Sequence, residues 1–229
     1  MRGYDTINRF LVNPASSFAE EDVSKFSMAC KAVILFDRAH SLGLSWAAGM
    51  ASQSSVVGPI TDIFWATSAT TDEAKENIAM CLAAMRHATR AFKDTIAPLA
   101  AGANIQDPLV VIHTMILLAS IRLDVAPSWT KASVESALAA VALVDGASFN
   151  NSGHVYPILG SLLAAVGQVL VDELIRIRGL TSKSGEDTER EMKVKNAVDR
   201  LDGVLGSCGA DCPYICEYYA RSVAFSSEI

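Results

Sequence analysis

Residues 155–178 read VYPILGSLLAAVGQVLVDELIRIR, and this stretch decides the predicted fold. Proline suits the first turn of a helix, where no backbone donor is required, so Pro157 indicates where the helix begins. Apolar residues then recur at spacings of three and four, the pattern of a helix with a broad buried face. They are Leu159, Leu162, Leu163, Val166, Val169, Leu170, Leu174 and Ile177. We therefore predict the central helix of an all-α domain over about 155–178.

A membrane span is the alternative interpretation of this stretch. We disfavour it because the apolar run is shorter than the ~20 residues that cross a bilayer, and because Gln168 interrupts it. Near its end, Asp172 and Glu173 precede Arg176 by four and three residues, a spacing that allows weak ion pairs on a helix surface. We predict that Arg176→Ala removes at most a surface ion pair, worth well under ~1 kcal/mol.

The composition favours an acidic, helical protein. Of the 229 residues, 51% are hydrophobic, many of them alanine, while only 7% are aromatic and seven are prolines. This balance favours helices over a β-sandwich. The net charge of −6 argues against a nucleic-acid-binding surface, because phosphate backbones are bound chiefly by clustered lysine and arginine.

Cysteine usage and the N-terminus indicate an intracellular protein without a metal site. The first ten residues lack the apolar core of a signal peptide, and five cysteines, an odd number, favour reduced thiols. Cys208, Cys212 and Cys216 are spaced by four. A structural zinc site needs four ligands, and no histidine lies nearby in sequence, so we expect buried thiols there, with neither metal nor cofactor in this chain.

Local signals predict about six to eight helices in a single irregular bundle. Residues 1–16 are expected to be poorly ordered, and residues 17–225 to form one helical domain. Capping boxes at Ser17 and at Thr70 open two of the helices. The first is expected to end at Gly43, because glycine commonly follows the end of a helix. The second has a basic face, which is either a contact surface or, more commonly, a solvated face. This face carries Lys75, Arg86, Arg90 and Lys93.

Three further helices are predicted around the central one. Pro108 opens a helix over 109–123 that is apolar nearly all round, and an alanine-rich helix ends near Gly146. After the central helix, an acidic turn favours another helix start, since carboxylates stabilise helix N-termini. This helix is expected to fade at Gly203 and Gly206.

No arrangement typical of an active site is present, so we predict that the chain is not an enzyme. There is no nucleophile elbow, phosphate-binding glycine loop or dinucleotide fingerprint. Asp172 and Glu173 are adjacent, so on a helix they diverge by about 100° and cannot act as a carboxylate pair. His113 lies within an apolar helix and is either a base or effector contact or, as we prefer, a core histidine with one hydrogen bond.

Five stretches, taken in order, resemble a known family over roughly residues 20–224. They are KAVILFDR (31–38), PLVVIHT (108–114) followed by ASIRL (119–123), ALAA (137–140), PILG (157–160) with QVLVDEL (168–174), and Cys212-Pro213. Together they resemble the fungal-specific transcription factor domain, the middle homology region of fungal binuclear zinc-cluster transcription factors. The chain differs from the family pattern at Asp124, Leu163 and Gly167, where His, Trp and Cys would be expected.

This resemblance implies a regulator of transcription by RNA polymerase II in a fungal nucleus. The chain resembles the C-terminal half of such a factor, whose six-cysteine zinc cluster reads DNA far upstream, so zinc is expected only there. These residues would then regulate activity through intramolecular contacts, co-regulators, self-association or a small-molecule effector, without contact to a membrane. Candidate effector or partner contacts are His113, Gln168, Asp172 and Arg176. The alternative is a stand-alone helical protein that binds proteins or small molecules and has no DNA-binding role.

Overall fold

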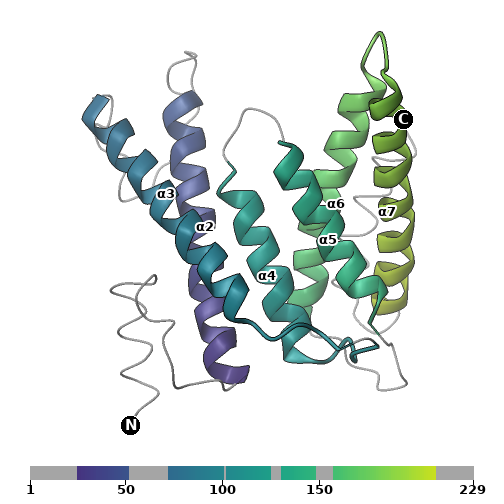
Figure 1. Ribbon diagram of the computed structural model, residues 1–229, viewed down its shortest axis with the longest axis horizontal. Coiled ribbons are helices and arrows are strands. Elements are labelled where there is room, and N and C mark those ends of the chain that lie inside the picture. The colour runs from purple at the N-terminus through teal and green to yellow at the C-terminus, as the bar shows by residue number, and fades with distance from the viewer. Residues whose placement is uncertain (1–24, 52–71, 101, 125–129, 148–156, 210–229) are drawn as a thin grey trace.

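The computed structural model of the chain describes residues 25–51, 72–100, 102–124, 130–147 and 157–209, and in these ranges it is built from helices without strands (Figure 1). The prediction of an all-α fold is therefore confirmed. The helices are α2 (Lys25–Ala51), α3 (Asp72–Thr95), α4 (Pro108–Arg122), α5 (Lys131–Asp145), α6 (Pro157–Arg178) and α7 (Gly185–Gly209). One cluster of buried apolar side chains includes residues of all six.

Helix α4 connects the two sides of the bundle. It begins as predicted, with Pro108 in its first turn and the side chain of Asp107 accepting a hydrogen bond from the backbone N–H of Leu109 at 3.0 Å. The helix packs against α2, α3, α5 and α6. Consequently it is buried on almost every side, at positions Val110, Ile112, Thr114, Met115, Ile116, Leu117, Leu118, Ala119 and Ile121.

Helix α6 is the predicted central helix, and it begins at Pro157. All of its predicted core positions are buried except Leu174, which is partly buried. Because α6 packs against α4, α5 and α7, it shares the centre of the bundle with α4. Among the described helices, the segment Ile158–Arg178 alone has the length and apolarity that could cross a membrane, so the prediction that this run is too short was wrong. Burial against three helices accounts for that apolarity.

Ion pairs and hydrogen bonds give the directions of α2 and α3 relative to α4. Lys25, the first residue of α2, pairs with Asp107 just before α4, with 2.9 Å between Nζ and Oδ1, so α2 and α4 run parallel from the same end. In α3 the guanidinium of Arg86 donates to the carbonyl oxygen of Leu123, where α4 ends, at 2.7 Å. Further along, the carbonyl oxygen of Ala97, after the end of α3, lies 3.0 Å from Nε2 of His113 in the first half of α4. Helix α3 therefore runs antiparallel to α4, along one edge of the bundle (Figure 1).

Helices α5, α6 and α7 form the opposite side of the bundle (Figure 1). Two ion pairs, each joining residues 55 positions apart, show that α5 and α7 run parallel. Nζ of Lys131 lies 3.6 Å from Oε1 of Glu186, near the start of both helices. Nη1 of Arg200 lies 3.2 Å from Oδ2 of Asp145, the last residue of α5. Between them α6 approaches α7 closely: a Cβ added at Gly167 would lie only 3.2 Å from Cδ2 of Leu201.

Two predicted helix ends were wrong. Helix α2 does not end at Gly43 but continues to Ala51, and α7 passes through Gly203 and Gly206 to Gly209. A glycine within a helix costs only about 1 kcal/mol relative to alanine. Packing beyond Gly43, where Trp46 lies against the core, and beyond Gly203, where Val204 and Leu205 are buried, offsets that cost. The predicted end near Gly146 is confirmed, since this residue caps α5.

Some predictions fall outside the described residues. They are the poor order of residues 1–16, the capping boxes at Ser17 and Thr70, the Cys212-Pro213 stretch of the resemblance, and the side chains of Cys208, Cys212 and Cys216.

The course of α7 through its glycines leads to a stability prediction. We expect Gly203→Ala and Gly206→Ala each to stabilise the protein by about 0.5–1 kcal/mol, because a Cβ at either position meets nothing within 4 Å. Thermal or urea unfolding measures the change. Gly102→Ala is the matched control: its Cβ would also meet nothing within 4 Å, but φ is 72° there. That substitution should destabilise, by ~1 kcal/mol or more. A loss of stability in both α7 variants would contradict the continuous helix.

Candidate functional site

A buried carboxylate joins α6 to α7. The side chain of Glu173 is 0% exposed and contacts two arginines. Arg176, one turn further along α6, donates from Nε at 2.7 Å and from Nη2 at 3.0 Å, one bond to each carboxylate oxygen. Arg190 reaches the same carboxylate from α7, with 2.7 Å between Nε and Oε1. The three side chains form what we call the Glu173 cluster.

The Glu173 cluster corrects the prediction that Arg176 makes only a weak surface ion pair. Glu173 is in the core, because α7 covers the face of α6 that carries it. A buried charge without a partner is costly, and breaking a buried pair typically costs about 3–5 kcal/mol. The hydrogen bonds that Arg176 donates to Glu173 raise the pKa of Arg176, although partial desolvation works in the opposite direction. The arginines therefore make the burial of this carboxylate possible.

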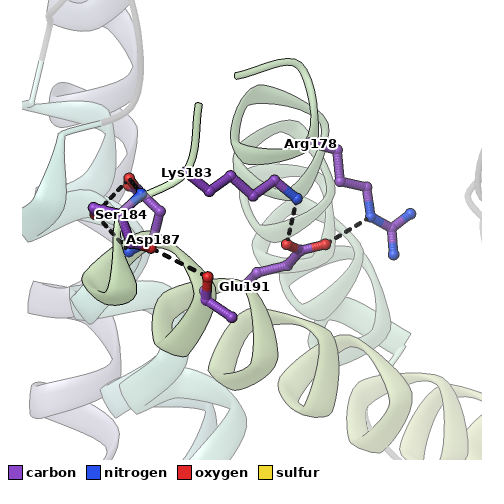
Figure 2. Close-up of polar contacts among 6 residues, drawn as sticks. Arg178, Lys183, Ser184, Asp187 and Glu191 are labelled. Atoms are coloured by element: carbon purple, nitrogen blue, oxygen red, sulfur yellow. Dashed lines mark hydrogen bonds and ion pairs between the residues drawn. The ribbon is translucent and has the colours of Figure 1, made fainter. Parts of the chain in front are cut away.

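The start of α7 carries a second polar group beside the cluster. The hydroxyl of Ser184 donates to Asp187 at 2.6 Å, and the backbone N–H of Asp187 donates back to that hydroxyl at 3.1 Å (Figure 2). This reciprocal arrangement is a helix cap. The bonds from Ser184 lower the pKa of Asp187, and the charges of Arg176 and Arg190 lower it further. The α7 cap is thus electrostatically coupled to the Glu173 cluster.

A third contact spans the turn between α6 and α7. Glu191 accepts a hydrogen bond from Lys183 at 2.7 Å and one from Arg178 at 3.2 Å (Figure 2). Both hydrogen bonds lower the pKa of the Glu191 carboxyl, and the bond from Lys183 has the larger effect. Ion pairs therefore join the last turns of α6 to the first turns of α7 on two sides. Glu173 and Arg190 pair on the buried side, and Arg178 and Glu191 pair on the exposed side.

The four predicted effector or partner contacts do not form one group. Gln168 and Asp172 pair with each other on the exposed face of α6, with 2.7 Å between Nε2 and Oδ1. Arg176 is engaged by Glu173. His113 lies in α4, where its Nε2 is 3.0 Å from the carbonyl oxygen of Ala97, in the segment after α3. His113 is thus a partly buried histidine with a backbone partner.

Sequence reasoning missed Arg190 and the burial of Glu173. Spacing along one helix reveals neighbours three and four residues apart, whereas Arg190 lies 17 positions beyond Glu173 and on another helix. A signal was present nevertheless. Glu173 lies four residues before Ile177 and four after Val169, and both are predicted core positions. A helical wheel therefore places this carboxylate toward the core.

Chemically, the α6–α7 junction is a set of mutually neutralising charges. Each carboxylate in it has a cationic or hydroxyl partner, which favours cohesion over acid–base chemistry. Among the residues that the structure describes, no three His, Cys, Asp or Glu side chains are grouped so that they could hold a metal ion.

Comparisons with family models, with curated proteins and with solved structures yielded no match to this chain.

The Glu173 cluster predicts an asymmetric response to substitution. The Arg176→Met/Arg190→Met variant leaves a carboxylate buried without a partner and should lose about 3–5 kcal/mol of stability. Glu173→Met should lose less, because the side chains of Arg176 and Arg190 are 41% and 23% exposed and can turn toward water. Adding Glu173→Met to the double variant should restore most of the loss. Urea unfolding monitored by circular dichroism measures all three.

Asp199→Ala serves as the control for these variants, because it removes a surface pair with Lys195 whose side chains are 57% and 55% exposed. Such a pair is worth at most about 1 kcal/mol. Equal losses in the arginine double variant and in Asp199→Ala would contradict a buried charge at this junction.

The junction also predicts a pH dependence. Because its pKa is lowered by folding, Glu191 contributes stability above its unfolded-state pKa and loses it as the pH falls through the folded-state value. Glu191→Gln should therefore be less stable than the wild type at pH about 6–7, with the difference shrinking toward zero below pH about 4. Unfolding measured across this range tests the sign. Glu135→Gln, an exposed position of α5, is the control, because a surface substitution away from any described ion pair changes stability little.

Proposed function

We propose that this chain is the regulatory helical domain of a fungal RNA polymerase II transcription factor and that it acts through contacts with other proteins. One observation carries the proposal. The first four stretches that resemble the middle homology region lie, in chain order, in the helices that build the core. KAVILFDR belongs to α2, PLVVIHT and most of ASIRL to α4, ALAA to α5, and PILG with QVLVDEL to α6.

About half of the residues that carry the resemblance are buried in the core. Ala32 and Leu35 in α2, Ile112 in α4, Ala140 in α5 and Leu170 in α6 are each at most 1% exposed. Core residues set how helices pack, and packing is the property that a helical regulatory domain would share with its family. The resemblance therefore supports a shared architecture and, through it, the proposed role.

Charge supports contacts with proteins over contacts with DNA. The net charge is −6, and the arginines of the Glu173 cluster are already paired with a carboxylate. DNA affinity depends chiefly on cations that face phosphates. In this proposal DNA is read by an upstream zinc cluster of the full-length factor in the nucleus, and zinc belongs to that cluster. The helices transmit the state of a bound co-regulator or effector.

Reporter assays test the proposal. The full chain, fused to an unrelated DNA-binding module, should change reporter output several-fold relative to that module alone at equal protein levels. The unfused chain should show no sequence-dependent binding to duplex DNA in a low-salt gel shift, because phosphate contacts would be too few. A fusion with the same output as the module alone would favour the stand-alone alternative. Sub-micromolar, sequence-dependent DNA binding by the unfused chain would overturn the proposal.

A further inference from the structure

The outer face of α3 carries a stripe of exposed residues. Glu76, Met80, Ala83, His87 and Arg90 follow one another at spacings of four and three, so they lie along one line of the helix. All five are exposed, and Met80 is 58% exposed although it is a large apolar residue. The opposite face, with Leu82, Met85, Ala88, Phe92 and Ile96, is buried in the bundle. We call the five exposed residues the α3 stripe.

Spacings of four and three are those of the contact line between two helices that pack side by side. Small residues let two helices approach closely, and alanines 79, 83 and 84 are exposed around Met80. Helix α3 packs against α2 and α4 among the described helices and lies at the edge of the bundle (Figure 1). Its outer face is thus placed where a further helix can lie against it.

Charge determines which helix fits. The stripe is acidic at its first position, Glu76, and basic at its last position, Arg90, with His87 one turn before. Neither Glu76 nor Arg90 forms an ion pair with any other described residue. An antiparallel helix with the same charge order, acidic near its N-terminus and basic near its C-terminus, would neutralise both ends. Helix α3 of a second copy of this chain has that order.

We propose that the α3 stripe is a homodimer interface, in which α3 of two copies of this chain pack antiparallel about a two-fold axis between Met80 and Ala83. In this arrangement Met80 of each copy contacts Ala83 of the other, and Glu76 of each copy lies opposite His87 of the other, one turn before its Arg90. The interface is isologous, as two-fold symmetry requires. It is independent of the function proposed above.

The size of the stripe sets the expected affinity. One helix pair buries less than the ~800 Å² per partner of a standard interface. The dimer should therefore dissociate in the micromolar range, with Kd on the order of 10–100 µM, and it should weaken as salt screens its charged ends.

Sedimentation velocity of the full chain over roughly 5–200 µM tests the proposal. Ala83→Glu places two carboxylates together near the axis and should leave a monomer. Glu76→Arg and Arg90→Glu should each raise the Kd at least about fivefold, because each creates two like-charge contacts. The combined variant Glu76→Arg/Arg90→Glu restores opposite charges and should return the Kd to within about threefold of the wild type. Circular dichroism checks that each variant keeps its helix content.

Lys195→Glu, an exposed charge reversal on α7, is the control and should leave the Kd unchanged. A wild type that stays monomeric at the highest concentration would overturn the proposal, and would leave the stripe to a different protein. A dimer that ignores Ala83→Glu would place the interface elsewhere. A combined variant no tighter than the single charge reversals would exclude the antiparallel arrangement.

Discussion

The burial of α4 on almost every side is the constraint on which the rest of the bundle depends. A helix that is apolar all round must be surrounded by protein, and four other helices supply that surrounding. Among the described helices, α2 and α3 contact the rest of the bundle through α4, since neither packs against α5, α6 or α7. Each substitution inside α4 therefore affects two groups of helices that do not otherwise touch.

The buried carboxylate of Glu173 adds a directional requirement to this apolar packing. Apolar surfaces tolerate sliding and rotation, whereas a carboxylate bound by two guanidinium groups fixes the register of α7 against α6. The close approach at Gly167 agrees with this requirement, because it brings α7 near enough for Arg190 to reach across. We interpret the Glu173 cluster as a determinant of how α6 and α7 meet, more than as a source of net stability.

Local sequence signals predicted most of the helices, because those signals act over a few residues. Pro108 and Gly146 marked helix boundaries correctly, and the spacing of Leu159 through Ile177 identified the buried face of α6. The predictions that helices end at Gly43, Gly203 and Gly206 were wrong, because packing by distant residues outweighs a local preference of about 1 kcal/mol. The Glu173 cluster was missed for the related reason that Arg190 lies on another helix. The proposed contact residues were chosen by residue type. The spacing along the helix did indicate that Arg176 pairs with Glu173, but not that this carboxylate is buried.

The parallel arrangement of α2 and α4 has a consequence for the order of folding. The ion pair that aligns their N-termini joins residues 82 positions apart, whereas α5, α6 and α7 follow one another along the chain. Contacts between distant segments form at a greater cost in chain entropy than contacts between neighbours. We therefore expect α4 to α7 to assemble first, with α2 docking afterwards onto a surface that already exists. Destabilising substitutions in α2 should then accelerate unfolding and leave the refolding rate almost unchanged, whereas those in α6 should slow refolding.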